Sequence, residues 1–123
     1  MKPLTEKEEA LMRMFWKRGP LFVKEIMESL PSPRPHVNTV STFVRILEEK
    51  GFLTHEQFGN TYKYIPIISE SDYGKSNLKD ILSKYFNNSF SSLVSTLIKD
   101  EDISDSEISD IIDRVKQSRD KEQ

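Results

Sequence analysis

The sequence has no cysteine, only two histidines among its 123 residues, and no long apolar run. Without cysteine there can be no disulfide and no thiolate metal site, which excludes zinc fingers and thiol-based sensors. His36 and His55 stand outside any metal-ligand spacing with carboxylates, so we expect no metal and no cofactor. No stretch approaches the roughly 20 apolar residues that span a bilayer. The N-terminus also lacks the apolar segment of a signal peptide, and we expect a cytoplasmic protein.

Sequence motifs of catalysis are missing as well. The chain contains no phosphate-binding glycine loop, no Gly-X-Ser-X-Gly elbow and no recognisable pairing of a nucleophile with a base. A small hydrolase would need a convergent Ser/His/Asp site that no motif indicates. We therefore expect that the protein is not an enzyme.

The net charge of −2 does not by itself favour a nucleic-acid partner. The charge is unevenly divided, however, because residues 1–68 carry +2 and residues 69–123 carry −4. The N-terminal part is therefore the better candidate for contact with phosphates.

The clearest periodic pattern lies in residues 36–52, HVNTVSTFVRILEEKGF. At about 100° per residue, one set of apolar side chains falls within an arc of roughly 120° and should be buried. This set comprises Val37, Val40, Phe43, Val44 and Leu47. The opposite face carries Asn38, Ser41, Thr42 and Arg45.

Short hydrogen-bonding side chains suit a helix that enters the major groove of DNA. Asn38 has the group that binds adenine with two hydrogen bonds, and Arg45 has the group that binds guanine. A merely solvated helix face usually carries longer Glu and Lys side chains, and the helix alone does not decide between the two interpretations. The flanking elements must decide it.

The elements on both sides of this helix predict a winged-helix domain over residues 1–68. Thr5 and Glu8 form a capping box that starts a first helix, which Gly19-Pro20 ends. A short β-prone segment, residues 21–23, precedes a second helix over residues 24–30 and a turn with three prolines. After the polar helix, residues 52–67 alternate around Gly59-Asn60 and predict a β-hairpin, the wing.

Residues 69–123 have a helical composition with no proline and one glycine. They predict three helices separated by Asn87-Asn88-Ser89 and by the acidic run at residues 100–102, which we expect to be a solvated loop. A region this short cannot bury its large apolar side chains alone, so we expect it to pair with a second copy as a dimerisation domain. The alternative is that these helices fold back onto the N-terminal domain of a monomer. The predicted dimerisation residues are Leu78, Ile81, Leu82, Tyr85, Phe86, Phe90, Leu93, Val94, Leu97, Ile98, Ile108, Ile111, Ile112 and Val115.

Several segments resemble, in order and spacing, the penicillinase repressor family of bacterial transcription regulators. They are LTEKEEALMRMFWKRGPLFVKEI, NTVSTFVRILEEKGFL and GNTYKYIP. The C-terminal part is also similar, especially at Ser92-Leu93-Val94 and in the acidic loop before Ser104. The resemblance implies a dimeric winged-helix repressor that binds a palindromic operator on double-stranded DNA. The predicted DNA contacts are His36, Asn38, Thr39, Ser41, Thr42 and Arg45 on the helix and Asn60 and Lys63 on the wing.

In members of this family that control β-lactamase, a membrane sensor peptidase signals the antibiotic and the repressor is cut within its dimerisation region. This sequence has Thr96-Leu97 where staphylococcal members have the Asn-Phe cleavage bond. It also has Ile46 where many members carry arginine, and it lacks the cysteine cluster of the copper-responsive branch. The alternative function is a winged-helix module that binds another protein, which would require apolar residues exposed on the third helix.

Overall fold

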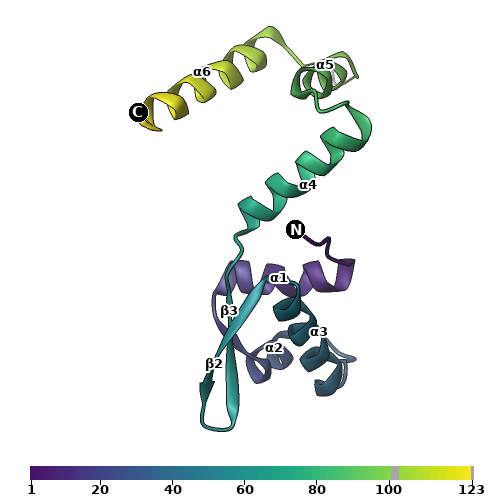
Figure 1. The fold of residues 1–123 in the computed structure, drawn as a ribbon, viewed down its shortest axis with the longest axis vertical. Helices are drawn as coiled ribbons and strands as arrows, with labels where there is room; N and C mark the ends of the chain where they lie inside the picture. The colour runs from purple at the N-terminus through teal and green to yellow at the C-terminus, as the bar shows by residue number, and fades with distance from the viewer. Residues whose placement is uncertain (101–102, 123) are drawn as a thin grey trace. The chain divides into compact units, whose positions relative to one another are not determined.

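A computed structural model describes residues 1–100 and 103–122 of the chain. The chain forms two compact units, Met1–Leu78 and Lys79–Gln123, and each is described here by itself. Glu101 and Asp102 of the expected acidic loop lie outside the described residues. In the first unit the elements follow in the order α1 (Glu6–Arg18), β1 (Leu21–Phe22), α2 (Val23–Ser29), α3 (Val37–Glu49), β2 (Leu53–Phe58), β3 (Thr61–Pro66) and the first turns of α4 (Glu70–Tyr85) (Figure 1).

The ends of α1 and α3 are set by local hydrogen bonds. The Thr5 hydroxyl accepts from the Glu8 amide at 3.2 Å, and the Glu8 carboxylate accepts from the Thr5 amide at 2.9 Å, which confirms the predicted capping box. At the start of α3, Nδ1 of His36 accepts a hydrogen bond from the Asn38 amide at 3.0 Å. Gly51, with φ of +87°, follows the last turn of α3, and its amide donates to the Glu48 carbonyl.

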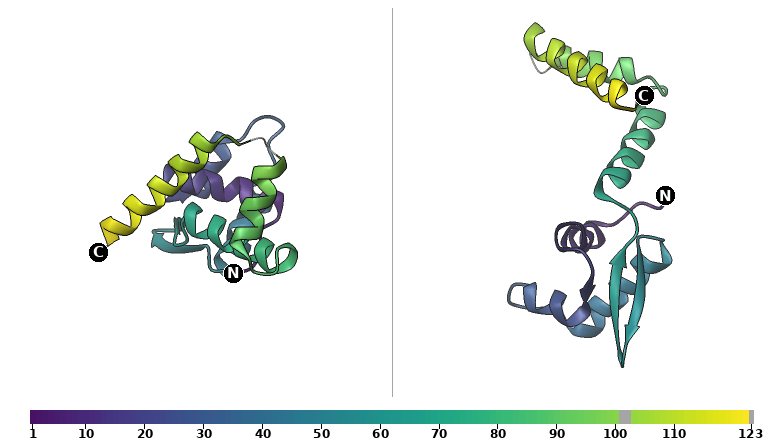
Figure 2. Two further views of the ribbon diagram at one scale, coloured as in Figure 1. Left: turned by 90° about the horizontal axis from the view of Figure 1, so that it is seen from above. Right: turned by 90° about the vertical axis from the view of Figure 1, so that its left-hand side faces the viewer.

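The sheet is antiparallel with strand order β1-β3-β2. Gly59 has φ of +61° in the two-residue turn between β2 and β3, as the first central position of a type II′ hairpin turn requires. The hairpin predicted around Gly59-Asn60 is thus present. Its turn projects beyond helices α1 to α3 (Figure 2, right) and forms the wing. Three helices and this wing make a winged helix-turn-helix.

The core of the first unit lies between its helices and the inner face of the sheet. It contains twelve buried apolar side chains: Leu11, Met12, Phe15, Leu21, Ile26, Val40, Val44, Leu47, Phe52, Leu53, Tyr64 and Tyr73. Three of them come from the apolar face predicted for α3, and Phe43 packs against the core while partly exposed. The prediction for Val37 was wrong, because its side chain is 45% exposed. Val37 is the first residue of α3, one turn before the helix meets the core.

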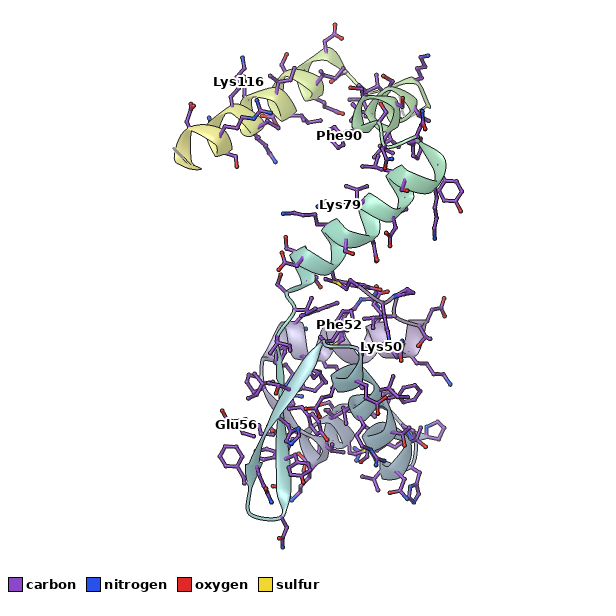
Figure 3. All side chains as sticks on the ribbon, in the orientation of Figure 1. Lys50, Phe52, Glu56, Lys79, Phe90 and Lys116 are labelled. Atoms are coloured by element: carbon purple, nitrogen blue, oxygen red, sulfur yellow. The ribbon has the colours of Figure 1, made fainter. Side chains whose placement is uncertain are left out.

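A buried ion pair connects the end of α3 to the start of α1. Nζ of Lys50 lies 2.7 Å from Oε1 of Glu8 and also donates to the Pro3 carbonyl at 3.2 Å. Burial alone raises the pKa of the Glu8 carboxyl, but hydrogen bonds from Lys50 and the Thr5 amide, with the charge of Lys50, lower the pKa below its usual value of 4.5. Figure 3 shows Lys50 and Phe52 beside α1.

The second unit contains the rest of α4, then α5 (Phe90–Asp100) and α6 (Asp105–Glu122). Asn87 and Asn88 both have positive φ and end α4 at the predicted interruption. No side chain in residues 79–99 or 103–120 is buried. Within the described residues, no helix has both the length and the apolar character needed to cross a membrane.

The functional boundary predicted between residues 68 and 69 remains a prediction. The compact units divide ten residues later, between Leu78 and Lys79. The reason is Tyr73 of α4, whose side chain is 6% exposed and belongs to the core of the first unit.

Candidate nucleic-acid interface

The polar face of α3 is accessible along its length. Asn38, Thr42 and Arg45 are exposed, and Ser41 is half-buried. The Thr42 hydroxyl donates to the Asn38 carbonyl at 2.8 Å, and Nε of Arg45 donates to the Ser41 carbonyl at 3.3 Å. The contact of Arg45 uses one of the five donors of its guanidinium group, which leaves the others for a ligand.

An open groove of about 600 Å³ lies beside this face, between α3, the start of α2 and the wing. Ser41 and Arg45 form its α3 side, and Thr61 and Tyr62 form its wing side. Burial, followed by the charge of Glu48, raises the pKa of Tyr64 at the back of the groove above 10. Burial and the neighbouring carboxylate thus both favour the neutral form of the Tyr64 phenol.

Of the residues that line the groove, the sequence analysis predicted only Ser41 and Arg45 as DNA contacts, and it missed Lys24 and Tyr62 among others. Lys24 lies at the start of α2 and brings a second cation to the groove that contains Arg45. Tyr62 is 45% exposed and contributes an aromatic ring and a hydroxyl. Glu25 also lines the groove, but its carboxylate accepts a hydrogen bond from the Phe22 amide at 2.9 Å. A basic residue at a helix start is a weak signal in sequence, because only the fold brings residue 24 close to residue 45.

A contact between His55 and Glu48 fastens the wing to the end of α3. Nδ1 of His55 lies 2.7 Å from Oε2 of Glu48, and the imidazole ring lies 4.5 Å from the ring of Tyr62, measured between centroids. This pair joins β2 to α3 on the side of the sheet that faces the groove. The wing therefore has a defined position next to the polar face of α3.

The remaining predicted contacts lie in different surroundings. Asn60 is exposed in the wing turn. Lys63 lies on the outer face of the sheet, with Nζ 5.4 Å from the centroid of the Phe22 ring, and does not line the groove. Thr39, although exposed, lines an apolar cavity of about 270 Å³ with Leu11 and Phe43, and His36 caps α3.

Comparison with known sequences agrees with this arrangement. A family model described as penicillinase repressor matches residues 4–117, which is most of the chain. The chain belongs to the penicillinase repressor family. Members of this family are DNA-binding transcriptional regulators and not enzymes.

Individual relatives cover nearly the whole of this repressor. The penicillinase repressor of Bacillus licheniformis is 26% identical over 113 residues, which are 88% of this chain and 85% of that protein. The methicillin resistance regulatory protein MecI of Mammaliicoccus sciuri is 25% identical over 109 residues, 88% of this chain and 89% of that protein. MecI of Staphylococcus aureus strain N315 is 24% identical with the same coverage. The similarity therefore extends through both units.

Proposed function

We propose that this repressor binds a palindromic operator as a homodimer and inserts α3 of each protomer into the major groove. The observation that supports this proposal is the accessible polar face of α3 beside the wing, opposite a face whose central residues are buried. Asn38, Ser41, Thr42 and Arg45 would read bases. The major groove admits an α-helix, and short side chains keep its axis close to the base edges.

The groove beside α3 fits the adjacent phosphate backbone. Lys24 and Arg45 supply positive charge from two elements, and the hydroxyl of Tyr62 supplies a further donor. The hydroxyl of Thr61 donates to the Phe58 carbonyl at 2.9 Å. Asn60 at the wing turn would contact the backbone farther along the duplex. We keep His36, Thr39 and Lys63 in the proposed interface as peripheral contacts.

Protein interaction through α3 is the less favoured function. Its exposed face is polar, apart from Val37 at the first position of the helix. An interaction platform would be expected to have a cluster of exposed apolar residues there.

The dimer proposal rests on the second unit. Exposed large apolar side chains occur on each of its helices, including Tyr85 at 75% and Phe90 at 61% exposure. A second copy would cover them, together with the half-buried members of the predicted set. Two-fold pairing would place the two copies of α3 about 34 to 36 Å apart, or at a multiple of that distance, on successive major grooves.

We further propose that the repressor acts in the cytoplasm on genes for antibiotic resistance, as the names of its relatives suggest. Release would follow a signal from a membrane sensor peptidase, with cleavage near Thr96-Leu97. Both residues are exposed on α5, and the Thr96 hydroxyl donates to the Ser92 carbonyl at 2.9 Å. A protease would therefore have to cut after local opening of this helix.

The test is a mobility-shift titration, at several salt concentrations, on the promoter region upstream of the gene for this protein. We expect one palindrome to bind with a dissociation constant of about 10 nM or lower. Arg45→Ala should weaken binding to it by about 1 to 3 kcal/mol if Arg45 contacts a base. Arg13→Ala, at an exposed position on α1, is the matched control and should change nothing.

Equal affinity for the promoter and for unrelated DNA would contradict the operator proposal and favour the protein-interaction alternative. Unchanged affinity of the Arg45 variant for a palindrome that the wild type prefers would remove only Arg45 from the reading face.

A further inference from the structure

Tyr73 attaches the first turns of α4 to the DNA-binding unit. Its ring lies 5.4 Å from Phe52 in an edge-to-face arrangement and 5.8 Å from Trp16, measured between centroids. Its hydroxyl accepts a hydrogen bond from the Leu4 amide at 3.1 Å. The ring thus contacts α1 and the residue before β2, while its oxygen holds the N-terminal segment that precedes α1. A side chain held on three sides fixes the rotation of the helix that carries it.

The segment that enters α4 is fixed as well. Nε1 of Trp16 donates to the Ile68 carbonyl at 2.9 Å, two residues before the helix begins. The Ser69 hydroxyl then accepts from the Asp72 amide at 3.0 Å and caps the first turn. Trp16, which is half-buried and packs against the core, therefore contacts both the entry to α4 and its buried tyrosine.

The same helix continues beyond the first unit. It ends at Tyr85, and its later turns carry Leu78, Ile81 and Tyr85, which are among the exposed residues of the proposed dimer interface. Gly74 directly follows Tyr73, and a Cβ placed on it would meet no atom within 4 Å. Glycine has a low helix propensity, so α4 is most easily bent immediately after its attachment point.

We propose that Tyr73 is a positioning residue that determines which spacing between operator half-sites the dimer accepts. The inference rests on the proposed function, because it needs a dimer and a palindrome. With Tyr73 in place, the helix that leads to the dimer interface starts in a fixed direction relative to α3. Without it, each DNA-binding unit turns more freely, and half-sites at several spacings are bound with similar affinity.

The experiment uses the full chain and a series of synthetic duplexes. The half-site is first defined by footprinting on the promoter, and the two half-sites are then moved apart or together one base pair at a time. Dissociation constants are measured for the wild type, Tyr73→Leu, Tyr73→Phe and Gly74→Ala, and sedimentation reports whether each is a dimer. Tyr73→Phe keeps the ring and loses only the acceptor for Leu4, so it covers the case in which Tyr73→Leu fails to fold.

We expect the wild type to prefer one spacing by tenfold or more over its neighbours. Tyr73→Leu should reduce this preference to less than threefold while remaining a dimer and keeping its affinity for a single half-site, and Tyr73→Phe should reduce it partially. Gly74→Ala should make the preference at least as steep, because alanine stiffens the helix without meeting a neighbouring atom. A spacing profile identical to that of the wild type in every folded tyrosine variant would overturn the inference. A wild type without any preferred palindrome would instead contradict the proposed function.

Discussion

The two units of this chain both contain many large apolar side chains, but only the first unit buries them. The first unit encloses twelve apolar side chains and a buried ion pair, Glu8–Lys50. The second unit has no buried side chain in residues 79–99 or 103–120, and its ion pair, Arg114–Asp110, is exposed. A unit of this size has too little interior to hide its apolar residues without a partner. The first unit should therefore be stable by itself, whereas the second should depend on association.

The largest expected effect is on the stability of the first unit, and it should differ between two phenylalanines, one in each unit. Phe52 is fully buried and contacts Tyr73, whereas Phe90 is 61% exposed at the start of α5 (Figure 3). Phe52→Ala should destabilise the first unit by about 3 to 5 kcal/mol, because it removes apolar contacts and leaves a cavity. Urea denaturation followed by the fluorescence of Trp16, the one tryptophan of the chain, measures this unit.

Phe90→Ala is the matched change and should leave the Trp16 transition within about 0.5 kcal/mol of the wild type. Its effect should appear instead as weaker dimerisation in sedimentation. If both variants shift the Trp16 transition equally, the two units do not differ in the way we describe.

A smaller effect is expected from two lysines. Lys50 is the partner of the buried carboxylate of Glu8, and Lys79 is exposed on α4. Lys50→Met should lower the free energy of unfolding of the first unit by about 2 to 3 kcal/mol. This loss is smaller than that expected for a fully buried pair, because Lys50 keeps some contact with water and Glu8 can take up a proton. The same denaturation measurement tests it. Lys79→Met is the control, and a loss as large as that of Lys50→Met would argue against a special role for the buried pair.

Local patterns predicted most of the first unit. The capping box at Thr5, the glycine turn at residue 59 and the two faces of α3 each depend on residues that are close in sequence, so their physics can be read from spacing. The role of Tyr73 could not be predicted in this way. Its hydrogen bond reaches a residue 69 positions away, and the bond from Trp16 to Ile68 spans 52 positions.

The candidate site also combines features set by residues close in sequence with features set by residues far apart in sequence. The face of α3 was evident from its helical period, whereas the groove that adds Lys24 and Tyr62 exists only after α2 and the wing have folded beside it. The position of Lys63 also depends on strand pairing, which sets it opposite Phe22, with its ammonium group over the Phe22 ring and outside the groove lining.

The second unit is tested by a charge placed on α5. Leu97→Asp puts an unpaired carboxylate on the face that we propose to be covered in the dimer, which is costly unless the charge stays in water. We expect the dimer dissociation constant to rise at least tenfold, or about 1.4 kcal/mol, in sedimentation equilibrium. The Trp16 transition of the first unit should not move.

Thr96→Asp introduces the same charge one residue earlier, on a different side of α5, and should have a smaller effect on association. Equal dimerisation of the wild type and the Leu97 variant would place the interface elsewhere.

The smallest effect concerns the acid stability of the first unit. The pKa of Glu8 in the folded chain is below 4.5, so its charged form contributes stability above pH 4.5, and this contribution is lost as the pH falls through the folded value. Glu8→Gln should therefore cost about 1 kcal/mol near neutral pH, and its difference from the wild type should shrink in acid. Urea denaturation at a series of pH values measures that difference. Glu9→Gln, next in sequence but paired with exposed Arg13, should stay within about 0.5 kcal/mol of the wild type throughout. If the loss of stability from Glu8→Gln does not change with pH, Glu8 stabilises the fold through its shape and hydrogen bonds and not through its charge. The buried pair Glu8–Lys50 would then differ from the exposed pair Glu9–Arg13 for reasons other than electrostatics.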